Sequence, residues 1–226
     1  MTYVVSDIHG EYRKFLDLLK QIRFSEDDLM YVVGDLVDYG EEPMELLADL
    51  SVRLNIYPVA GEHDYLAARM LTGFEKMRKS GAAPDAGYIS EMTAWVKEKG
   101  GQPTLSGFRE LDEEQREGIL DYLTEMPLFE EAEAGGREYL LVHKGIAGDP
   151  AEHPLEEDTP EHFFSAANTP DPNTVPLDGK ILIVGHKASQ SDRIGYGKGS
   201  IFLDCGAGQG GKLGCLCLEN GREYYV

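Results

Sequence analysis

Short apolar runs alternate with amphipathic segments along the first third of the chain. Three runs with the composition of buried strands, YVV, LMYVV and LNIYPVA, lie at residues 3–5, 29–33 and 54–60. Apolar residues recur at helical spacing over 11–22 and 66–77, and Pro43 fits the first turn of another helix between the second and third runs. Strands that alternate with helices in this way predict a parallel sheet with right-handed crossovers.

The pattern changes after about residue 75. From there to residue 126 the chain carries amphipathic segments such as EMTAWVKEKGG and LDEEQREGILDYLTEM, joined by loops that contain Gly and Pro. This stretch has no apolar run typical of a strand. We therefore expect a helical cap at about 75–126, inserted between two sheet-forming halves of a single domain that spans residues 1–226.

Short strands return in the last third of the chain. They read REYLLVH, KILIVGH, GSIFLDCG, KLGCLCLE and REYYV, and several are joined by glycine turns, which is typical of an antiparallel sheet. Before the second of them, an acidic and proline-containing stretch over 148–177 predicts a long exposed loop.

The composition is that of a folded, soluble chain without a membrane span. Of the 226 residues, 42% are hydrophobic and 27% are charged, and no apolar run reaches the ~20 residues of a membrane helix. The N-terminus lacks the basic start and long apolar stretch of a secretory signal. Cys205, Cys215 and Cys217 are too few and too clustered for a disulfide framework, so they predict buried strand positions in a cytoplasmic protein.

The net charge of −20 restricts the possible partners. An excess of acidic residues on this scale repels phosphate backbones, which argues against a nucleic-acid groove. A small anionic substrate would require a local reversal of the field, and a pair of divalent cations would supply it.

Histidines and acids gather directly after the apolar runs. Asp7 and His9 follow the first run, and because side chains alternate along an extended chain, both point the same way. Alone, such a pair is either a satisfied turn pair or two ligands of one cation. Ligands bind at the carboxyl ends of the strands in an open α/β sheet, so five strand ends with this chemistry favour a dinuclear metal site. The five motifs are SDIHG, GDLVDYG, GEHD, LVHKGI and LIVGHKAS.

The order of these motifs, closed by DCGAGQGGKLG, resembles the serine/threonine phosphoprotein phosphatase branch of the calcineurin-like metallophosphoesterases. The usual pattern there is GDIHG, GDxVDRG, GNHE, a histidine after a strand, and GHT. The resemblance extends from residue 2 to about residue 220 and is weakest in the helical middle. It implies an α/β (α+β) fold, a four-layer αββα sandwich of two mixed β-sheets flanked by helices, with the metals at the strand ends.

The resemblance also implies roles for individual residues. Two divalent metal ions, with Mn expected and Fe, Zn or Mg as alternatives, would generate a hydroxide that attacks phosphorus. His63 would be the general acid that protonates the leaving group, and Asp38 would orient it, unless Asp38 only caps the turn before Gly40. The implied metal ligands are Asp7, His9, Asp35, Glu62, His143 and His186, with Asp35 bridging the two ions.

Several positions depart from the family pattern. Glu62 stands where the family has a neutral Asn, and Tyr39 stands where it has an Arg that clamps the phosphate. Residues 138–192, which should hold a second clamping Arg, contain no arginine. Lys144 and Lys187 are substitute contacts for the phosphate or, equally well, solvated lysines, so the candidate substrate-binding residues are these two and Tyr39.

These features predict a dinuclear-metal phosphoesterase that acts on a phosphorylated small molecule or a phosphoprotein. Without the clamping arginines, we expect weak activity or a substrate other than the usual phosphoprotein or dinucleotide. The alternative is a degenerate family member that binds metal or a ligand without efficient turnover. Retention of both His63 and Asp38 favours an enzyme, because pure binding needs no general acid.

Overall fold

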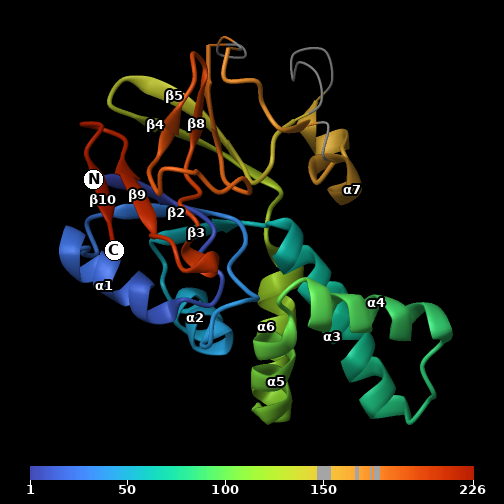
Figure 1. Ribbon diagram of the computed structural model, residues 1–226. Helices are drawn as coiled ribbons and strands as arrows, with labels where there is room; N and C mark the ends of the chain where they lie inside the picture. Colours follow the sequence, from blue (N-terminus) through green and yellow to red (C-terminus); the bar gives the residue numbers. More distant parts are fainter. Residues whose placement is uncertain (147–153, 166–167, 174, 176–178) are drawn as a thin grey trace.

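Two β-sheets pack face to face, and helices cover their outer faces (Figure 1). The computed structural model describes residues 1–146, 154–165, 168–173, 175 and 179–226. Both sheets have five strands and both are mixed, with parallel and antiparallel pairs. This αββα sandwich confirms the predicted fold class.

The first sheet contains the three strands expected near the N-terminus. β1 (Thr2–Val5), β2 (Leu29–Val33) and β3 (Ile56–Val59) run parallel, as their alternation with helices predicts. Two late strands, β9 (Gly214–Cys217) and β10 (Glu223–Tyr225), extend the sheet on the other side of β1, and β9 is antiparallel to it. The strand order is β10-β9-β1-β2-β3, so β1 is the central strand.

The second sheet consists of strands β4 (Phe129–Ala134), β5 (Arg137–Val142), β6 (Ile181–Val184), β8 (Ser200–Phe202) and β7 (Gly195–Tyr196), in that spatial order. The prediction of an antiparallel sheet is wrong for its centre, where β5, β6 and β8 are parallel. Glycine turns mark where strands end but not which strands pair, and a long connection between β5 and β6 allows a parallel crossover. The edge strand β4 escapes prediction because its sequence, FEEAEA, lacks an apolar run.

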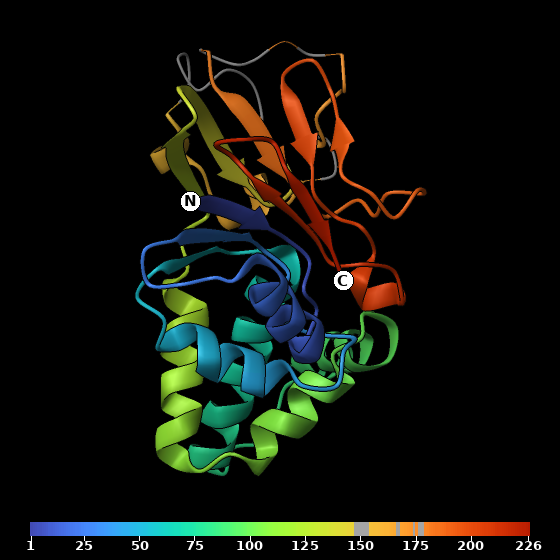
Figure 2. The ribbon, with the colours of Figure 1, turned by 90° about the vertical axis from the view of Figure 1, so that its left-hand side faces the viewer.

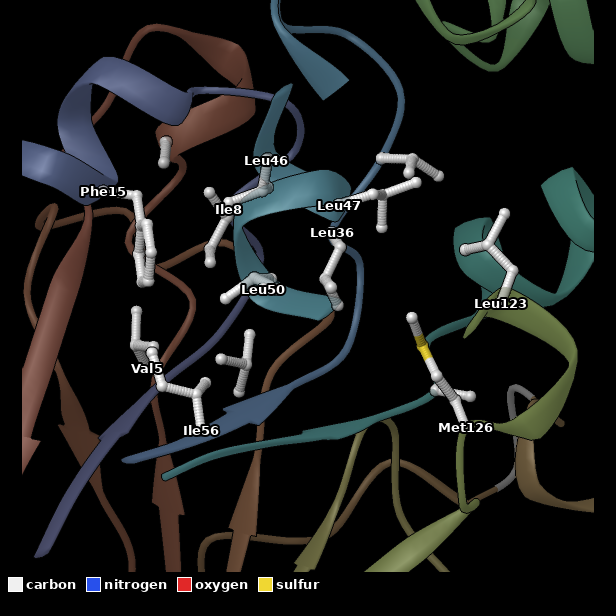
Figure 3. Close-up of a cluster of buried hydrophobic side chains, with 14 of the residues drawn as sticks. Val5, Ile8, Phe15, Leu36, Leu46, Leu47, Leu50, Ile56, Leu123 and Met126 are labelled. Atoms are coloured by element: carbon white, nitrogen blue, oxygen red, sulfur yellow. The ribbon is translucent and has the colours of Figure 1, made fainter. Parts of the chain in front are cut away.

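Helices cover the face of the first sheet that points away from the second. α1 (Tyr12–Ile22) and α2 (Pro43–Ser51) lie where predicted, whereas α3 (Glu62–Ser80) begins one turn before its apolar pattern and continues past residue 75. Figure 3 shows the side chains of the sheet, α1 and α2 meeting in one buried cluster. Its members include Val5, Ile8, Phe15, Leu46, Leu50 and Ile56.

The middle of the chain is helical, as expected. α4 (Ala86–Glu98), α5 (Gln102–Glu110) and α6 (Glu113–Glu125) contact α2 and α3 and join the same buried cluster through Trp95 and Phe108. α3 runs unbroken from the first sheet into this layer. Helices α4, α5 and α6 therefore share one hydrophobic core with the strands of the first sheet. That the segment is an inserted cap within one domain remains a prediction.

A second hydrophobic cluster fills the space between the two sheets, which Figure 2 shows stacked one above the other. Val4 and Val33 from the first sheet pack there with Leu141 and Ile183 from the second. A third and smaller cluster lies on the outer face of the second sheet, where it includes the apolar side chain of the short helix α7 (Pro160–Phe163). Full burial of one such side chain contributes about 1.5–3 kcal/mol, so both faces of this sheet help to stabilise the fold.

The predicted loop over 148–177 lies partly outside the described residues. Its described part is not wholly an exposed loop, because it contains α7 and a 3₁₀ turn at Leu155–Glu157 whose first residue is buried. The cysteines behave as predicted: Cys215 and Cys217 lie in β9, Cys205 follows β8, and all three are buried and unbridged. Within the described ranges, no helix combines the length and apolarity needed to cross a bilayer.

Candidate metal centre

Acidic and histidine side chains from both sheets meet at the carboxyl ends of the parallel strands. Asp7 and His9 follow β1, Asp35 follows β2, His143 follows β5 and His186 follows β6. The backbone N–H of His186 donates to both carboxylate oxygens of Asp7 at 3.1 Å, which joins the two sheets at this point. Five of the six predicted ligands therefore converge.

Asp7, His9 and Asp35 form the first ligand group. One ligand atom from each lies within 4.8 Å of the others. His9 Nδ1 lies 2.9 Å from the Val37 carbonyl, and because a carbonyl only accepts, this nitrogen is the donor. The lone pair is then on Nε2, which lies 3.7 Å from Asp35 Oδ2.

Asp35, His143 and His186 form the second ligand group, again within 4.8 Å of one another. His143 Nδ1 lies 3.0 Å from the Val33 carbonyl and donates to it, so Nε2 is the nitrogen that could bind a cation after losing its proton. Nε2 lies 3.2 Å from Asp35 Oδ2 without the geometry of a hydrogen bond, and it is buried with no hydrogen-bond partner in the described part of the chain. An unpartnered buried nitrogen is costly, and a cation would satisfy it.

Asp35 belongs to both groups. Its Oδ1 accepts the backbone N–H of His63 at 3.0 Å, and its Oδ2 faces His9 and His143. Burial alone would raise the pKa of Asp35, but the positive charge of His143 holds it well below its ordinary value. Asp35 is thus ionised, and its Oδ2 faces a histidine of each ligand group.

The charge balance of the site also fits cations. Burial alone would lower the pKa of His143, but the charges of Asp35 and Asp7 raise it to about 10. A histidine that holds a proton beside buried carboxylates is a site where a metal ion can take the place of that proton. The donor set of imidazole nitrogens and carboxylate oxygens suits Mn, Fe or Zn.

An unusual backbone sets these positions. Among the described residues, eight other than glycine have positive φ, and six of these lie at the site with φ between 50° and 73°. Such conformations cost of order 1–3 kcal/mol each, so the surrounding fold must enforce them. The extended strand ends before Asp7, so Asp7 and His9 share a direction because the loop is tightly turned, not because side chains alternate. The six are Asp7, His9, Asp35, Asp38, Tyr39 and His186.

Two glycines let the carboxylates approach the backbone of neighbouring loops. A Cβ on Gly61 would lie 2.1 Å from Asp35 Oδ1, and a Cβ on Gly185 would lie 2.1 Å from Asp7 Oδ2. Any side chain at either position would displace a ligand oxygen. This close approach explains why GEHD and GHKAS begin with glycine.

His63 lies in the first turn of α3, and Asp38 holds it there. His63 Nδ1 lies 2.7 Å from Asp38 Oδ2. Asp38 is fully buried and also accepts hydrogen bonds from Trp95 Nε1 at 2.8 Å and from Thr104 Oγ1 at 2.7 Å. The Asp38 carboxylate therefore points to His63 and to helices α4 and α5, which the turn-cap interpretation does not predict.

The same contacts set the charge of His63. Burial alone would lower the pKa of His63, but the hydrogen bond to Asp38 and the charge of Asp35 raise it to about 9. The imidazolium form is favoured, and Nε2 is left to carry a transferable proton.

Sequence reasoning misses three side chains at this site. Trp95 and Thr104 give no local signal, because they lie 57 and 66 residues from Asp38 on helices of ordinary amphipathic pattern. Asp204 is 6% exposed and follows β8, as the predicted ligands follow their strands. Its place after the apolar run SIFL could have identified it.

Glu62 does not lie in the second ligand group. Its Oε2 accepts a hydrogen bond from Lys144 Nζ at 2.9 Å, and its Oε1 is 4.0 Å from His186 Nδ1. Lys144 is buried, which excludes the interpretation of this residue as a solvated lysine. It is instead engaged by Glu62. Lys187 is exposed.

Tyr39 places an exposed ring beside His9 of the first ligand group and beside His63. Its ring centroid lies 5.0 Å from that of His9 and 5.4 Å from that of His63, and the residue is 40% exposed. Its backbone N–H donates to the Gly100 carbonyl at 2.9 Å, which ties it to the loop between α4 and α5. An aromatic ring thus borders the site at this position.

A model of the calcineurin-like phosphoesterase family matches residues 2–200 of the chain. The chain belongs to this family. The predicted resemblance is therefore confirmed, and this calcineurin-like phosphoesterase is a member of a family of metal-dependent hydrolases.

Curated relatives of this phosphoesterase include proteins named symmetrical bis(5'-nucleosyl)-tetraphosphatase. The one from Marinomonas sp. (strain MWYL1) is 25% identical over 186 residues, which cover 76% of this chain and 58% of the relative. The one from Erwinia tasmaniensis is 29% identical over 120 residues, which cover 51% of this chain and 41% of the relative. The chain spans about half the length of these curated relatives.

Solved structures share the fold of this phosphoesterase. A protein provisionally named as a diadenosine tetraphosphatase superposes with a TM-score of 0.62 and 18% identity, covering 100% of this chain and 92% of that one. The cold-active protein-tyrosine phosphatase of a psychrophilic Shewanella sp. gives a TM-score of 0.57 and 15% identity, covering 100% and 80%. At these identities the likeness shows the fold alone.

Proposed function

We propose that this phosphoesterase hydrolyses phosphate esters with two divalent cations and with His63 as general acid. The observation that supports this function best is the pair of ligand groups that share Asp35, next to the hydrogen-bonded pair of His63 and Asp38. Asp7, His9 and Asp35 would hold the first cation, and Asp35, His143 and His186 the second.

When bound, the two cations supply a water acidic enough to act as the nucleophile at phosphorus near neutral pH. The chain's own residues serve the leaving group. Asp38 orients the imidazole of His63 through Nδ1 and stabilises its charged form, so Nε2 can donate a proton to the departing oxygen. Trp95 and Thr104 hold the Asp38 carboxylate in place from α4 and α5.

The proposed substrate carries little charge on the phosphorus that reacts. Tyr39 presents a ring where the family pattern has a clamping Arg, and Lys144 is engaged by Glu62. Without the two clamping arginines of the family pattern, the site suits a phosphodiester, or an internal phosphate of a polyphosphate chain, better than a doubly charged monoester. The names of the curated relatives refer to dinucleoside tetraphosphates, which supports this class of substrate and departs from the expectation that the substrate is not a dinucleotide.

A second candidate is a protein that binds metal or a phosphorylated ligand without efficient turnover. The contact between Glu62 and Lys144 favours it, because a carboxylate at 4.0 Å from His186 adds negative charge beside the second ligand group. The ordered bond between His63 and Asp38 favours the enzyme.

Metal analysis of the purified protein, with turnover assays in added Mn, separates the two candidates. The substrates are a phosphopeptide, a monoester, a diester and a dinucleoside tetraphosphate. The enzyme is expected to bind two ions per chain and to act best on the diester or the tetraphosphate. Two bound ions without turnover on any of the four would support the binding protein instead.

A further inference from the structure

Asp204 is a buried carboxylate for which the proposed mechanism has no role. It lies two residues beyond β8 and is 6% exposed. Its Oδ1 accepts the backbone N–H of Gly206 at 2.8 Å, and its carbonyl accepts the N–H of Ser189 at 2.9 Å. No Lys or Arg of the described ranges forms an ion pair with it. A carboxylate buried in this way normally has a positive partner.

The register of the second sheet places Asp204 at the metal edge. β6 and β8 are parallel, with Val184 opposite Phe202, and each of His186 and Asp204 follows its strand by two residues, so both lie at the same edge of the sheet. The parallel pairing of β5 with β6 brings His143 to the same edge. Three adjacent strands thus end in His143, His186 and Asp204, two of which are ligand candidates.

The loop that begins at Asp204 lies against the first ligand group. Gly208, in this loop, packs on His9, and a Cβ on this glycine would be 2.6 Å from the His9 Cβ. A carboxylate that is buried without a positive partner at this edge would be stabilised by a nearby cation.

We propose that Asp204 is a positioning residue of the first cation site, acting from outside the direct ligands. The group of ligand atoms within 4.8 Å consists of Asp7, His9 and Asp35 and does not include Asp204. Its charge stabilises the cation and its rigid loop holds His9 in place. This role rests on the proposed dinuclear site, and it adds a third strand end that carries a carboxylate, after those of Asp7 and Asp35.

Asp204→Asn removes the charge with little change of shape. The amide oxygen can still accept from Gly206, so the loop keeps its hydrogen bond. Residues of this outer kind typically change metal affinity by about 10–100-fold. The affinity of one of the two Mn ions should therefore fall by that factor, while the other remains as in the wild type.

The stability of the metal-free protein distinguishes this role from a structural one. Asp204→Asn removes the cost of burying an unpaired charge, so this variant should melt at the same or a higher temperature in excess chelator. A residue that only supports the fold would lower the melting temperature and would weaken both ions alike.

The test is a calorimetric titration of Mn into metal-free protein, with melting curves in chelator for each variant. Asp192→Asn is the matched control, since it removes one negative charge from an exposed position in the turn that contacts Asp204. It should bind Mn like the wild type. If the wild type binds two ions and Asp204→Asn binds both equally well, or melts lower in chelator, the role of Asp204 is overturned and the proposed function stands. If the wild type binds no Mn, the proposed function fails, and the role of Asp204 fails with it.

Discussion

Two parts of the site differ in how firmly the fold fixes their side chains. We call Asp7, His9, Asp35, Asp38, His63, His143 and His186 the inner site, and Tyr39, Glu62, Lys144 and Lys187 the outer site. In the inner site, left-handed backbone, buried carbonyl acceptors and close glycines fix each side chain. The outer site has less support: Tyr39 shares the left-handed backbone, but its ring and Lys187 are exposed, and Glu62 and Lys144 engage each other.

This difference indicates what a substitution in each part of the site would change. A change in the inner site disturbs several hydrogen bonds and the backbone with it, whereas a change in the outer site alters charge and shape without altering the fold. The family chemistry is thus tied to the architecture, and substrate recognition is separable from it. Four predictions test this separation.

The largest effect is expected for Asp35→Asn. Asp35 is shared by both ligand groups, and an amide gives only one oxygen donor and no charge. Both ions should be lost together, and turnover should fall to background. Metal content per chain and activity in added Mn measure the result. Retention of one tightly bound ion would contradict the bridging role.

A large but smaller effect is expected for His63→Ala. Turnover should fall by about 10²–10⁴-fold at unchanged metal content, since general acid catalysis contributes about that much. The loss should shrink for substrates with good leaving groups such as nitrophenol, which barely need the proton. Equal losses on good and poor leaving groups would refute the assigned role.

An intermediate effect is expected for Trp95→Phe, which removes the hydrogen bond from α4 to the buried Asp38. The free energy of unfolding should fall by about 1.5–3 kcal/mol, the usual contribution of a hydrogen bond to a charged group. Turnover should fall by roughly tenfold, which corresponds to about 1.4 kcal/mol of lost transition-state stabilisation.

Tyr88→Phe is the control for that prediction. It removes a neutral hydrogen bond of the same helix, from the Tyr88 hydroxyl to the Met70 carbonyl. Its unfolding free energy should fall by about 0.5–1.5 kcal/mol with turnover unchanged. If both variants lose turnover equally, α4 affects the site only through the general stability of the fold.

An effect of about the same size as that of Trp95→Phe is expected for the outer site, and it is a gain. Tyr39→Arg with Glu62→Asn restores one clamping guanidinium and releases Lys144 from its ion pair. Each charge-assisted contact contributes roughly 1.5–3 kcal/mol, so kcat/KM for a phosphate monoester should rise at least about tenfold. Tyr39→Lys with Glu62→Asn is the matched control and should gain less, because a lysine cannot form the bidentate contact. A wild-type protein that already hydrolyses phosphopeptides as well as the double variant would show the reasoning to be wrong.

The sequence predicts the first sheet and the inner site well. The apolar runs and the motifs after them are local, and parallel βαβ units have one dominant handedness, so Asp7, Asp35 and His186 can be expected to meet before any coordinates are known. The motif order also predicts the bond between His63 and Asp38, which the structure places at 2.7 Å.

Non-local contacts account for what the sequence does not predict. The pairing of β9 with β1 and the parallel centre of the second sheet depend on which distant strands meet, and glycine turns do not encode this. The partners of Asp38 on α4 and α5 depend likewise on helix packing. Glu62 lies in the motif GEHD, but its hydrogen-bond partner, Lys144, follows a strand of the second sheet.

The central place of β1 has a consequence for how the protein is made. β1 leads into Asp7, and it pairs with β2 on one side and with β9, more than 200 residues later, on the other. At a synthesis rate of about 5–20 residues per second, roughly 10–40 s separate the emergence of these two strands from the ribosome. During that interval one edge of β1 is open to pairing with other chains. The loop that carries Asp7 and His9 therefore reaches its final form only after nearly all of this chain has been translated, and newly made protein should acquire metal late.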